Sequence, residues 1–245
     1  METNTVLDTL FNHSSVRRFT DEPIPPRHLE AAVRAGQQAA TSSNVQAYSA
    51  VCIRDPEKLE RLVECSGGQK KVAECPLFMV ICGDTRRHRL LVEKAGHEFV
   101  SNLEVFMVAT IDASLFAQNM VVAFESMGYG TCYIGGIRND LNKTQEVLRL
   151  PEGVWPLFGL CIGRPARDSD VRPRLDSEAV VFEERYPTDS EMFARMEAYD
   201  ARLSEWYAAH GLDPVRWTDR METRFQEAAR VGNFDFYRRM GASFH

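Results

Sequence analysis

The sequence lacks the short motifs that identify several common enzyme classes. Its 245 residues contain no Cys-x-x-Cys pair, no Gly-x-Gly-x-x-Gly run, no Walker loop and no Gly-x-Ser-x-Gly turn. These absences argue against a zinc ribbon or dithiol site, against the two familiar phosphate-binding loops and against a serine hydrolase. The 6 histidines have no metal-ligand spacing, so no metal site is expected.

An excess of positive charge and a clear membrane segment are absent as well. The chain has 29 Lys and Arg against 35 Asp and Glu, which argues against a nucleic-acid partner but leaves room for a small anion in a basic pocket. Residues 1–5 show no signal-peptide pattern. The longest apolar stretch, 111–127, carries Asp112 and Glu125 and is interpreted as too short and too polar to span a membrane. A cytoplasmic protein with no membrane partner is expected.

The chain does contain an uneven alternation of helix and strand patterns. Short apolar runs predict strands over residues 48–53, 77–82, 131–134 and 155–162. Apolar periodicity predicts helices over residues 4–12, 27–40, 56–66, 110–127 and 140–150, the last capped by Asp140, and again from 187 onward. Residues 67–71 are predicted to form a turn, and the charged segment 86–100 carries no predicted element. The pattern favours an α+β fold in one domain, 1–245, with 187–245 as a C-terminal helical extension.

Two basic segments lie far apart in the sequence and share a chemistry. Residues 13–19 combine a histidine and two serines with Arg17, while residues 172–174 hold Arg172 and Arg174. Guanidinium groups match phosphate oxygens two at a time and serine hydroxyls complete such a shell, so the segments suggest a phosphate-bearing cofactor gripped from both ends of the fold. The alternative is that these are surface arginines in solvent-facing pairs.

A glycine pair follows the predicted strand 131–134. Gly135 and Gly136 would let a planar ligand approach the backbone and would expose an N–H donor to it. Arg138 adds a positive charge close to this turn. Taken alone, the pair is better explained as a plain turn.

Eight short motifs occur in an order that resembles the FMN-dependent nitroreductase family. They cover residues 13–17, 41–43, 67–70, 117–119, 128–130, 133–139, 156–160 and 172–175. The resemblance spans nearly the whole chain and is to the subgroup of NADPH-dependent flavin reductases and oxygen-insensitive nitroreductases. It implies a nitroreductase-like mixed central sheet flanked by helices, assembled as an intertwined homodimer.

The resemblance implies that both ends of the chain bind the FMN phosphate. His13 and Ser15 would reach this phosphate, and Arg172 and Arg174 would close on it. Arg17 would lie near the N1 and O2 edge of the flavin. A reduced flavin is anionic at N1, so a fixed cation there would favour the two-electron reduced state.

The flavin ring is implied to rest on the turn after strand 131–134. Gln69 would hydrogen-bond its polar edge, and a backbone N–H of the glycine pair would point at N5, the hydride acceptor. Beyond this help from Gly135 and Arg17, no side chain is expected to act as a catalytic acid, base or nucleophile. One ring face would be lined by Tyr133, Ile134, Gly135 and Gly136, with Arg138 nearby.

Other residues are implied to come from a second subunit or to contact the substrates. Thr41, Ser42 and Ser43 would reach FMN from the partner chain of the homodimer. Ser14 departs from the family pattern, where Arg is common, and Asn44 departs where an aromatic residue is common beside the substrate.

The nicotinamide cofactor and the substrate involve three later residues. Arg216 would bind the 2′-phosphate of NADPH, with His210 standing where relatives tend to carry Arg. Arg230, placed in a later helix, would border the substrate. The alternative for all three is that they are solvated loop charges.

The resemblance therefore predicts a homodimeric oxidoreductase. It would take hydride from NADPH onto FMN and pass two electrons to a small-molecule acceptor, a nitroaromatic, quinone or flavin, in a ping-pong cycle. One alternative is a non-catalytic FMN-binding carrier or sensor, which would have no need of a nicotinamide phosphate site. Another is an anion-binding regulatory module without flavin.

Overall fold

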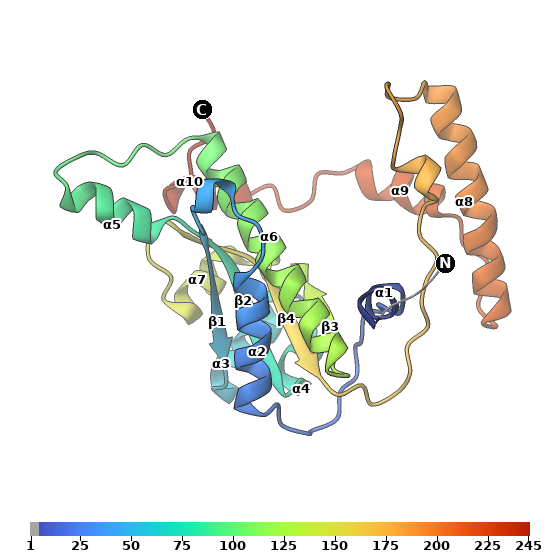
Figure 1. Ribbon diagram of the computed structural model, residues 1–245, viewed down its shortest axis with the longest axis horizontal. Coiled ribbons are helices and arrows are strands. Elements are labelled where there is room, and N and C mark those ends of the chain that lie inside the picture. Colours follow the sequence, from blue (N-terminus) through green and yellow to red (C-terminus); the bar gives the residue numbers. More distant parts are fainter. Residues whose placement is uncertain (1–4) are drawn as a thin grey trace. The chain divides into compact units, whose positions relative to one another are not determined.

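A four-stranded antiparallel sheet forms the centre of the first of two units into which the chain divides (Figure 1). The computed structural model describes residues 5–245, and this unit comprises residues 5–169 and 230–245 of them. The strand order is β1-β2-β4-β3. All four predicted strands are confirmed, as β1 (Tyr48–Ile53), β2 (Leu77–Asp84), β3 (Gly130–Ile134) and β4 (Val154–Gly163).

Strand β2 is buried along its whole length because helices cover both faces of the sheet. Leu77, Met79 and Ile81 pack on one side against α2 (Pro26–Gln37) and α6 (Leu103–Ser126). Phe78, Val80 and Cys82 point to the other side, the period of two expected for a strand. That second side is covered by α3 (Pro56–Cys65), α7 (Leu141–Leu148) and α10 (Asn233–Arg239).

The N-terminal segment runs along the free edge of β3. Helix α1 (Thr5–Phe11) accounts for the predicted helix 4–12, of which Asn4 lies outside the described residues. After it, Ser15 and Thr131 form a parallel bridge, and the amide of Val16 donates to the carbonyl of Thr131 at 2.9 Å. Since the four strands pair antiparallel, this bridge supplies the parallel component of the sheet among the described residues.

Helix α6 begins earlier than the sequence predicts. The helix predicted over 110–127 starts at Leu103, because Asn102 caps it by accepting the amide of Val105 at 3.0 Å. By length and composition alone its 24 residues could cross a membrane, a test that the core helices of soluble proteins also pass. Here it packs against the sheet and α2, and its buried Asp112 is bonded within the protein.

The segment 86–100, for which no element was predicted, contains a further helix. Helix α5 (Arg86–Lys94) starts where Asp84 accepts the amide of Arg86 at 3.0 Å. None of its residues is buried, so it carries no apolar stripe by which periodicity could reveal it. The predicted turn 67–71 ends in the short helix α4 (Lys71–Glu74), and Asp140 caps α7 as predicted by accepting the amide of Lys143 at 2.9 Å.

The second unit comprises residues 170–229 and is built on helices, as predicted for the C-terminal part. A short turn (Ser177–Ala179) precedes α8 (Asp189–Ala209) and α9 (Trp217–Phe225). Tyr199, Leu203 and Tyr207 of α8 form its core with Leu175 and Trp217. The second unit begins at Asp170. The predicted division, one domain with a helical extension from residue 187, stays a prediction.

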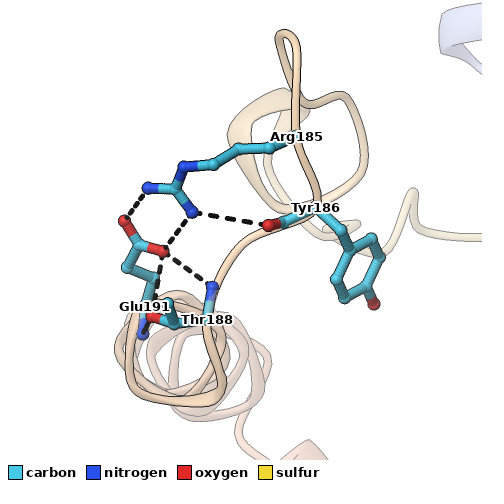
Figure 2. A network of polar contacts seen from close by, with 4 residues as sticks. All are labelled: Arg185, Tyr186, Thr188 and Glu191. Atoms are coloured by element: carbon cyan, nitrogen blue, oxygen red, sulfur yellow. Dashed lines mark hydrogen bonds and ion pairs between the residues drawn. The ribbon is translucent and has the colours of Figure 1, made fainter.

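A polar network fixes the start of helix α8 (Figure 2). The Thr188 hydroxyl accepts the Glu191 amide at 3.3 Å, and the Glu191 carboxylate accepts the Thr188 amide at 2.7 Å, a reciprocal capping box. The guanidinium of Arg185 donates to both oxygens of the same carboxylate, at 2.9 and 3.0 Å. These bonds from Arg185 and then Thr188 lower the pKa of Glu191 to about 2.

This network predicts how the α8 terminus responds to acid. Because the folded pKa lies below the ordinary value, the capping contribution is fully present above the ordinary pKa of about 4.3 and is lost as the pH falls through about 2. Carbon-detected NMR should show the Glu191 carboxyl titrating near pH 2 in the wild type and closer to 4 in Arg185→Ala. A wild-type midpoint above pH 4 would contradict the network.

Candidate functional site

The predicted site residues nearest the N-terminus lie along the outer edge of strand β3. The Ser15 bridge to Thr131 places residues 13–17 along this edge. His13 Nδ1 donates to Glu125 Oε1 at 2.8 Å, and the Thr131 hydroxyl donates to the same oxygen at 2.8 Å. With the Nδ1 proton committed to a carboxylate, the orientation of the imidazole ring is fixed. Glu125, which holds His13, was not predicted as a site residue, because it lies 112 residues away in the sequence.

Two cations lie close to strand β3. The Arg17 side chain is exposed and donates from Nη1 to the carbonyl of its own segment at Ser15, 3.2 Å away. Burial raises the pKa of the Cys132 thiol, and the charges of Arg17 and Lys71 oppose that shift, so both cations act on the middle of β3. Lys71 was missed as a site residue, although it ends the Gly-Gly-Gln-Lys-Lys turn that the sequence displays.

The end of strand β3 leads into the glycine pair, which packs against the loop carrying Gln69. Gln69 Nε2 donates to the Ser66 carbonyl at 2.9 Å. A Cβ added to Gly136 would stand 2.5 Å from that carbonyl oxygen and would also collide with the Gln69 amide. Gly136 is therefore required to be glycine by this loop, and it lies against Gln69, which the family resemblance likewise assigns to the flavin.

Arg138 is bonded to the protein backbone. Its Nη1 donates to the carbonyl of Leu157, and its Nη2 would lie 3.3 Å from a Cβ added at Gly135. The guanidinium therefore lies against the glycine turn, and part of its hydrogen-bonding capacity is used by β4.

Arg230 also reaches this turn. Its Nε donates to Asn139 Oδ1 at 2.8 Å, from a left-handed backbone with φ of 58°. Arg230 was predicted to lie in a helix, and this prediction is wrong, because α9 ends at Phe225 and α10 begins at Asn233.

Tyr133 and Ile134 point to opposite faces of strand β3. The Tyr133 hydroxyl donates to Gln118 Oε1 at 3.2 Å, and its ring meets Phe158 edge-on. Burial, with a smaller effect of the Glu125 charge, raises the pKa of Tyr133, so its phenol stays protonated. The Ile134 side chain is 1% exposed in the core, so only its backbone can line a ligand site.

The predicted partner-subunit residues Thr41, Ser42 and Ser43 lie at the opposite edge of the sheet. They precede β1, which is separated from β3 by two strands, or about 14 Å at ordinary strand spacing. Ser42, Ser43 and Asn44 are exposed there in a single turn. Within one chain, the strand order thus keeps these hydroxyls away from the edge that carries His13.

In the second unit, Arg172 and His210 both lie against an aromatic pair, Trp206 and Tyr207. The Arg172 guanidinium lies 5.5 Å from the ring centres of both Trp206 and Tyr207. The His210 ring stacks on Trp206 at 4.1 Å and donates from Nδ1 to the Trp206 carbonyl. Arg174 is exposed, and its carbonyl accepts from another arginine of the unit at 3.1 Å.

Arg216 lines a basic cavity of about 850 Å³ in the second unit. It pairs with two carboxylates, Asp200 at 3.3 Å and Asp219 at 3.4 Å. Although burial opposes the shift, hydrogen bonds from Thr218 and the Arg216 charge hold the pKa of Asp200 below its usual value. Arg220 and Arg224 line the same cavity and were missed, although both follow Arg216 at spacings of four.

The donor set suits an aromatic ligand with a phosphate group. Along β3 lie a hydroxyl, an imidazole and two cations, and beside them is a turn whose glycines leave the backbone open. Such backbone amides and cations are what a flavin ring and its phosphate require.

Comparison with known proteins places this arrangement in a family. A model described as "Nitroreductase family" matches residues 10–164, and one described as its C-terminal domain matches residues 172–244. The chain belongs to the nitroreductase family. This confirms the resemblance that the short motifs indicated.

Several relatives within the family are similar along nearly their full length. The FMN reductase (NADPH) of Bacillus subtilis is 41% identical, over 97% of this chain and 98% of that one. The oxygen-insensitive NADPH nitroreductase of Salmonella typhimurium is 37% identical, over 96% and 97%. The solved structure of NADPH:FMN oxidoreductase from Vibrio harveyi, complexed with NAD+, has a TM-score of 0.91 at 30% identity, over 99% and 100%. The α+β fold expected from the sequence is confirmed by this likeness.

The contact between Gly136 and Gln69 predicts the effect of adding one methyl group. Gly136→Ala should displace Gln69 and the Ser66 carbonyl, because the new Cβ overlaps both. We expect the purified variant to retain less than about a tenth of the flavin that the wild type holds, as fits the loss of one or two ligand hydrogen bonds.

A matched control is Gly232→Ala, where a Cβ meets nothing within 4 Å and φ is −70°. Its flavin content, read from visible absorbance per chain, should equal that of the wild type. Full flavin content in Gly136→Ala would show that this turn does not contact the cofactor.

Proposed function

We propose that this chain is an FMN-dependent oxidoreductase that takes hydride from NADPH and reduces nitroaromatics, quinones or flavins in a two-electron ping-pong cycle. The gathering of Ser15, Arg17, Gln69 and Gly136 around strand β3 carries this proposal. It is supported by the family and by relatives named as NADPH-dependent reductases. The relatives named above are reductases, which favours the enzyme over the alternative of a non-catalytic FMN carrier or sensor.

Bound FMN supplies the redox chemistry, accepting hydride and returning two electrons. The residues of the chain supply binding and electrostatics. Arg17 and Lys71 place two positive charges near the middle of β3, where a phosphate or a reduced, negatively charged ring would be stabilised. Gly135 and Gly136 leave the backbone amides open to a planar group.

His13 is held for a role at the phosphate. Its Nδ1 donates to Glu125 Oε1 at 2.8 Å, which fixes the orientation of the imidazole ring at the β3 edge. Ser15 lies two residues further along, where it forms the bridge to Thr131. We assign the FMN phosphate to these two side chains, with Arg172 and Arg174 as the proposed contribution of the second unit.

The assembly we propose is a homodimer. Helix α6 exposes Leu103, Met107, Ile111 and Leu115, spaced four residues apart on one face and each more than 40% exposed in the single chain. A continuous apolar stripe of this kind is typical of a protein interface. A second copy would cover the stripe and could bring Ser42 and Ser43 to the β3 edge of its partner. We place the enzyme in the cytoplasm.

The basic cavity of the second unit is the proposed site of the NADPH 2′-phosphate. Arg216, Arg220 and Arg224 line it together with the hydroxyls of Ser204 and Thr223. Two carboxylates already neutralise part of the Arg216 charge, so the other two arginines are needed for a positive potential. His210, stacked on Trp206, and Arg230, at Asn139, are proposed to border the nicotinamide nucleotide and the substrate.

A reduction experiment tests directly whether the protein is a catalytic flavoenzyme. NADPH added without oxygen to the purified yellow protein should bleach the flavin absorbance within seconds, and adding a quinone or nitroaromatic should restore it. The two half-reactions should proceed separately, as a ping-pong cycle requires. A flavin that stays oxidised with NADPH would favour the carrier or sensor, and a colourless protein would favour a module without flavin.

The cavity predicts how the enzyme distinguishes NADPH from NADH. Arg216→Ala should raise the KM for NADPH by about tenfold, the loss of one charge-assisted hydrogen bond, and leave the KM for NADH nearly unchanged. Steady-state kinetics with both nucleotides measure the ratio. Arg185→Ala, in the α8 network of the same unit, serves as a control and should change neither KM. Equal changes in the KM for NADPH and the KM for NADH would show that this cavity does not bind the 2′-phosphate.

A further inference from the structure

The turn that precedes strand β1 has an unusual backbone. Ser43, Asn44 and Gln46 all have positive φ, at 46°, 59° and 55°, although none is glycine. Side chains other than glycine rarely adopt this left-handed region, and it persists only where neighbouring groups enforce it. Three such residues among four consecutive positions therefore require an external restraint.

Asp112 of helix α6 supplies one restraint. Its side chain is buried, with 1% of the residue exposed. Oδ1 accepts the amide of Ser42 at 3.2 Å, and Oδ2 accepts the amide of Ala47 at 3.1 Å. One carboxylate thus joins the two ends of the strained turn. Between these two ends, the amides of Asn44 and Val45 donate to the carbonyls of Thr41 and Ser42, at 3.4 and 2.8 Å.

Helix α5 supplies a second restraint from the other side. Arg87 Nη2 donates to the carbonyl of Gln46 at 3.0 Å and to that of Tyr48 at 2.5 Å. His88 Nε2 donates to the carbonyl of Val45 at 2.8 Å. The amides at the two ends of the turn are therefore held by a carboxylate and two of its carbonyls by basic side chains, while Ser42 and Ser43 remain exposed.

We propose that Asp112 is a positioning residue for cofactor binding, which holds the turn 42–47 so that Ser42 and Ser43 present their hydroxyls to the cofactor phosphate bound by a second copy. The inference rests on the proposed FMN function and on the proposed dimer. Asp112 follows Ile111 of the exposed apolar stripe on the same helix. Helix α6 would thereby set both the contact between the two copies and the conformation of the turn that one copy offers to the other.

The placement of a carboxylate in this apolar helix supports that role. A buried aspartate is costly unless its oxygens are hydrogen-bonded, and both Asp112 oxygens are bonded to the turn. An asparagine at this position would keep one acceptor but offer an N–H₂ group to the other amide. The turn would then lose its closure at one end, with the shape of the side chain preserved.

A double-mutant cycle tests the inference on the intact holoenzyme. The four proteins are wild type, Asp112→Asn, the pair Ser42→Ala with Ser43→Ala, and all three changes together. FMN release on dilution, followed by flavin fluorescence, measures the dissociation constant, and sedimentation measures assembly. We expect Asp112→Asn and the serine pair each to raise the dissociation constant about tenfold, the size of one lost charge-assisted hydrogen bond. In the combined variant the dissociation constant should rise less than about twofold further, because a misplaced turn has no hydroxyl contact left to lose.

A purely structural role for Asp112 predicts a different result. The melting temperature would fall, but removing the hydroxyls would then weaken FMN binding as much in Asp112→Asn as in the wild type. Such additivity would overturn the inference, and so would a serine pair that leaves FMN affinity unchanged. In either case bleaching of wild-type flavin by NADPH would leave the proposed function standing, whereas a wild type without FMN binding would overturn both.

Two further variants keep the test decisive. Arg87→Ala releases the turn from the α5 side and should reproduce both the weaker FMN binding and the lost serine effect, even if Asp112→Asn does not fold. Asp55→Asn is the matched control, because Asp55 also accepts two backbone amides, at the start of α3. It should leave the FMN dissociation constant and the serine effect unchanged.

Discussion

The pairing of residues 15 and 16 with Thr131 along the outer edge of strand β3 is the contact on which the site depends. It brings the N-terminal segment beside the strand whose end carries the glycine pair. Gly130 makes this approach possible, because the Val16 side chain occupies the space that a Cβ would need. The pairing also covers an exposed strand edge, which would otherwise invite association with other chains.

Helix α6 connects the two edges of the sheet through carboxylates in an otherwise apolar sequence. Glu125, in its last turn, orients His13 at the β3 edge. Asp112, near its middle, closes the turn before β1 at the opposite edge. Each carboxylate is committed to donors of the protein, which is why burial in this helix is tolerated. The remaining apolar face serves the core on one side and, in the proposed dimer, a second copy on the other.

The second unit uses aromatic rings to collect cations. Trp206 and Tyr207 carry Arg172, His210 and Arg220 on their faces and edges, and the cavity beside them is lined by further arginines. Carboxylates are close by, since Asp200 and Asp219 pair with Arg216. The arginines around Trp206, Tyr207 and the cavity are therefore a local cluster, in a chain whose net charge is −6.

The sequence by itself determined the strands, most helices and the Asp140 cap, because apolar periodicity and caps act over a few residues. It failed where an element had no buried face, as in α5, or where a cap lay outside the apolar run, as at Asn102. Only the tertiary structure decided that Glu125 holds His13, that Asp112 closes a turn 65 to 70 residues away and that Arg230 lies in a loop at Asn139. These are polar contacts between residues distant in sequence, and no local pattern encodes which donor meets which acceptor once the helices pack on the sheet.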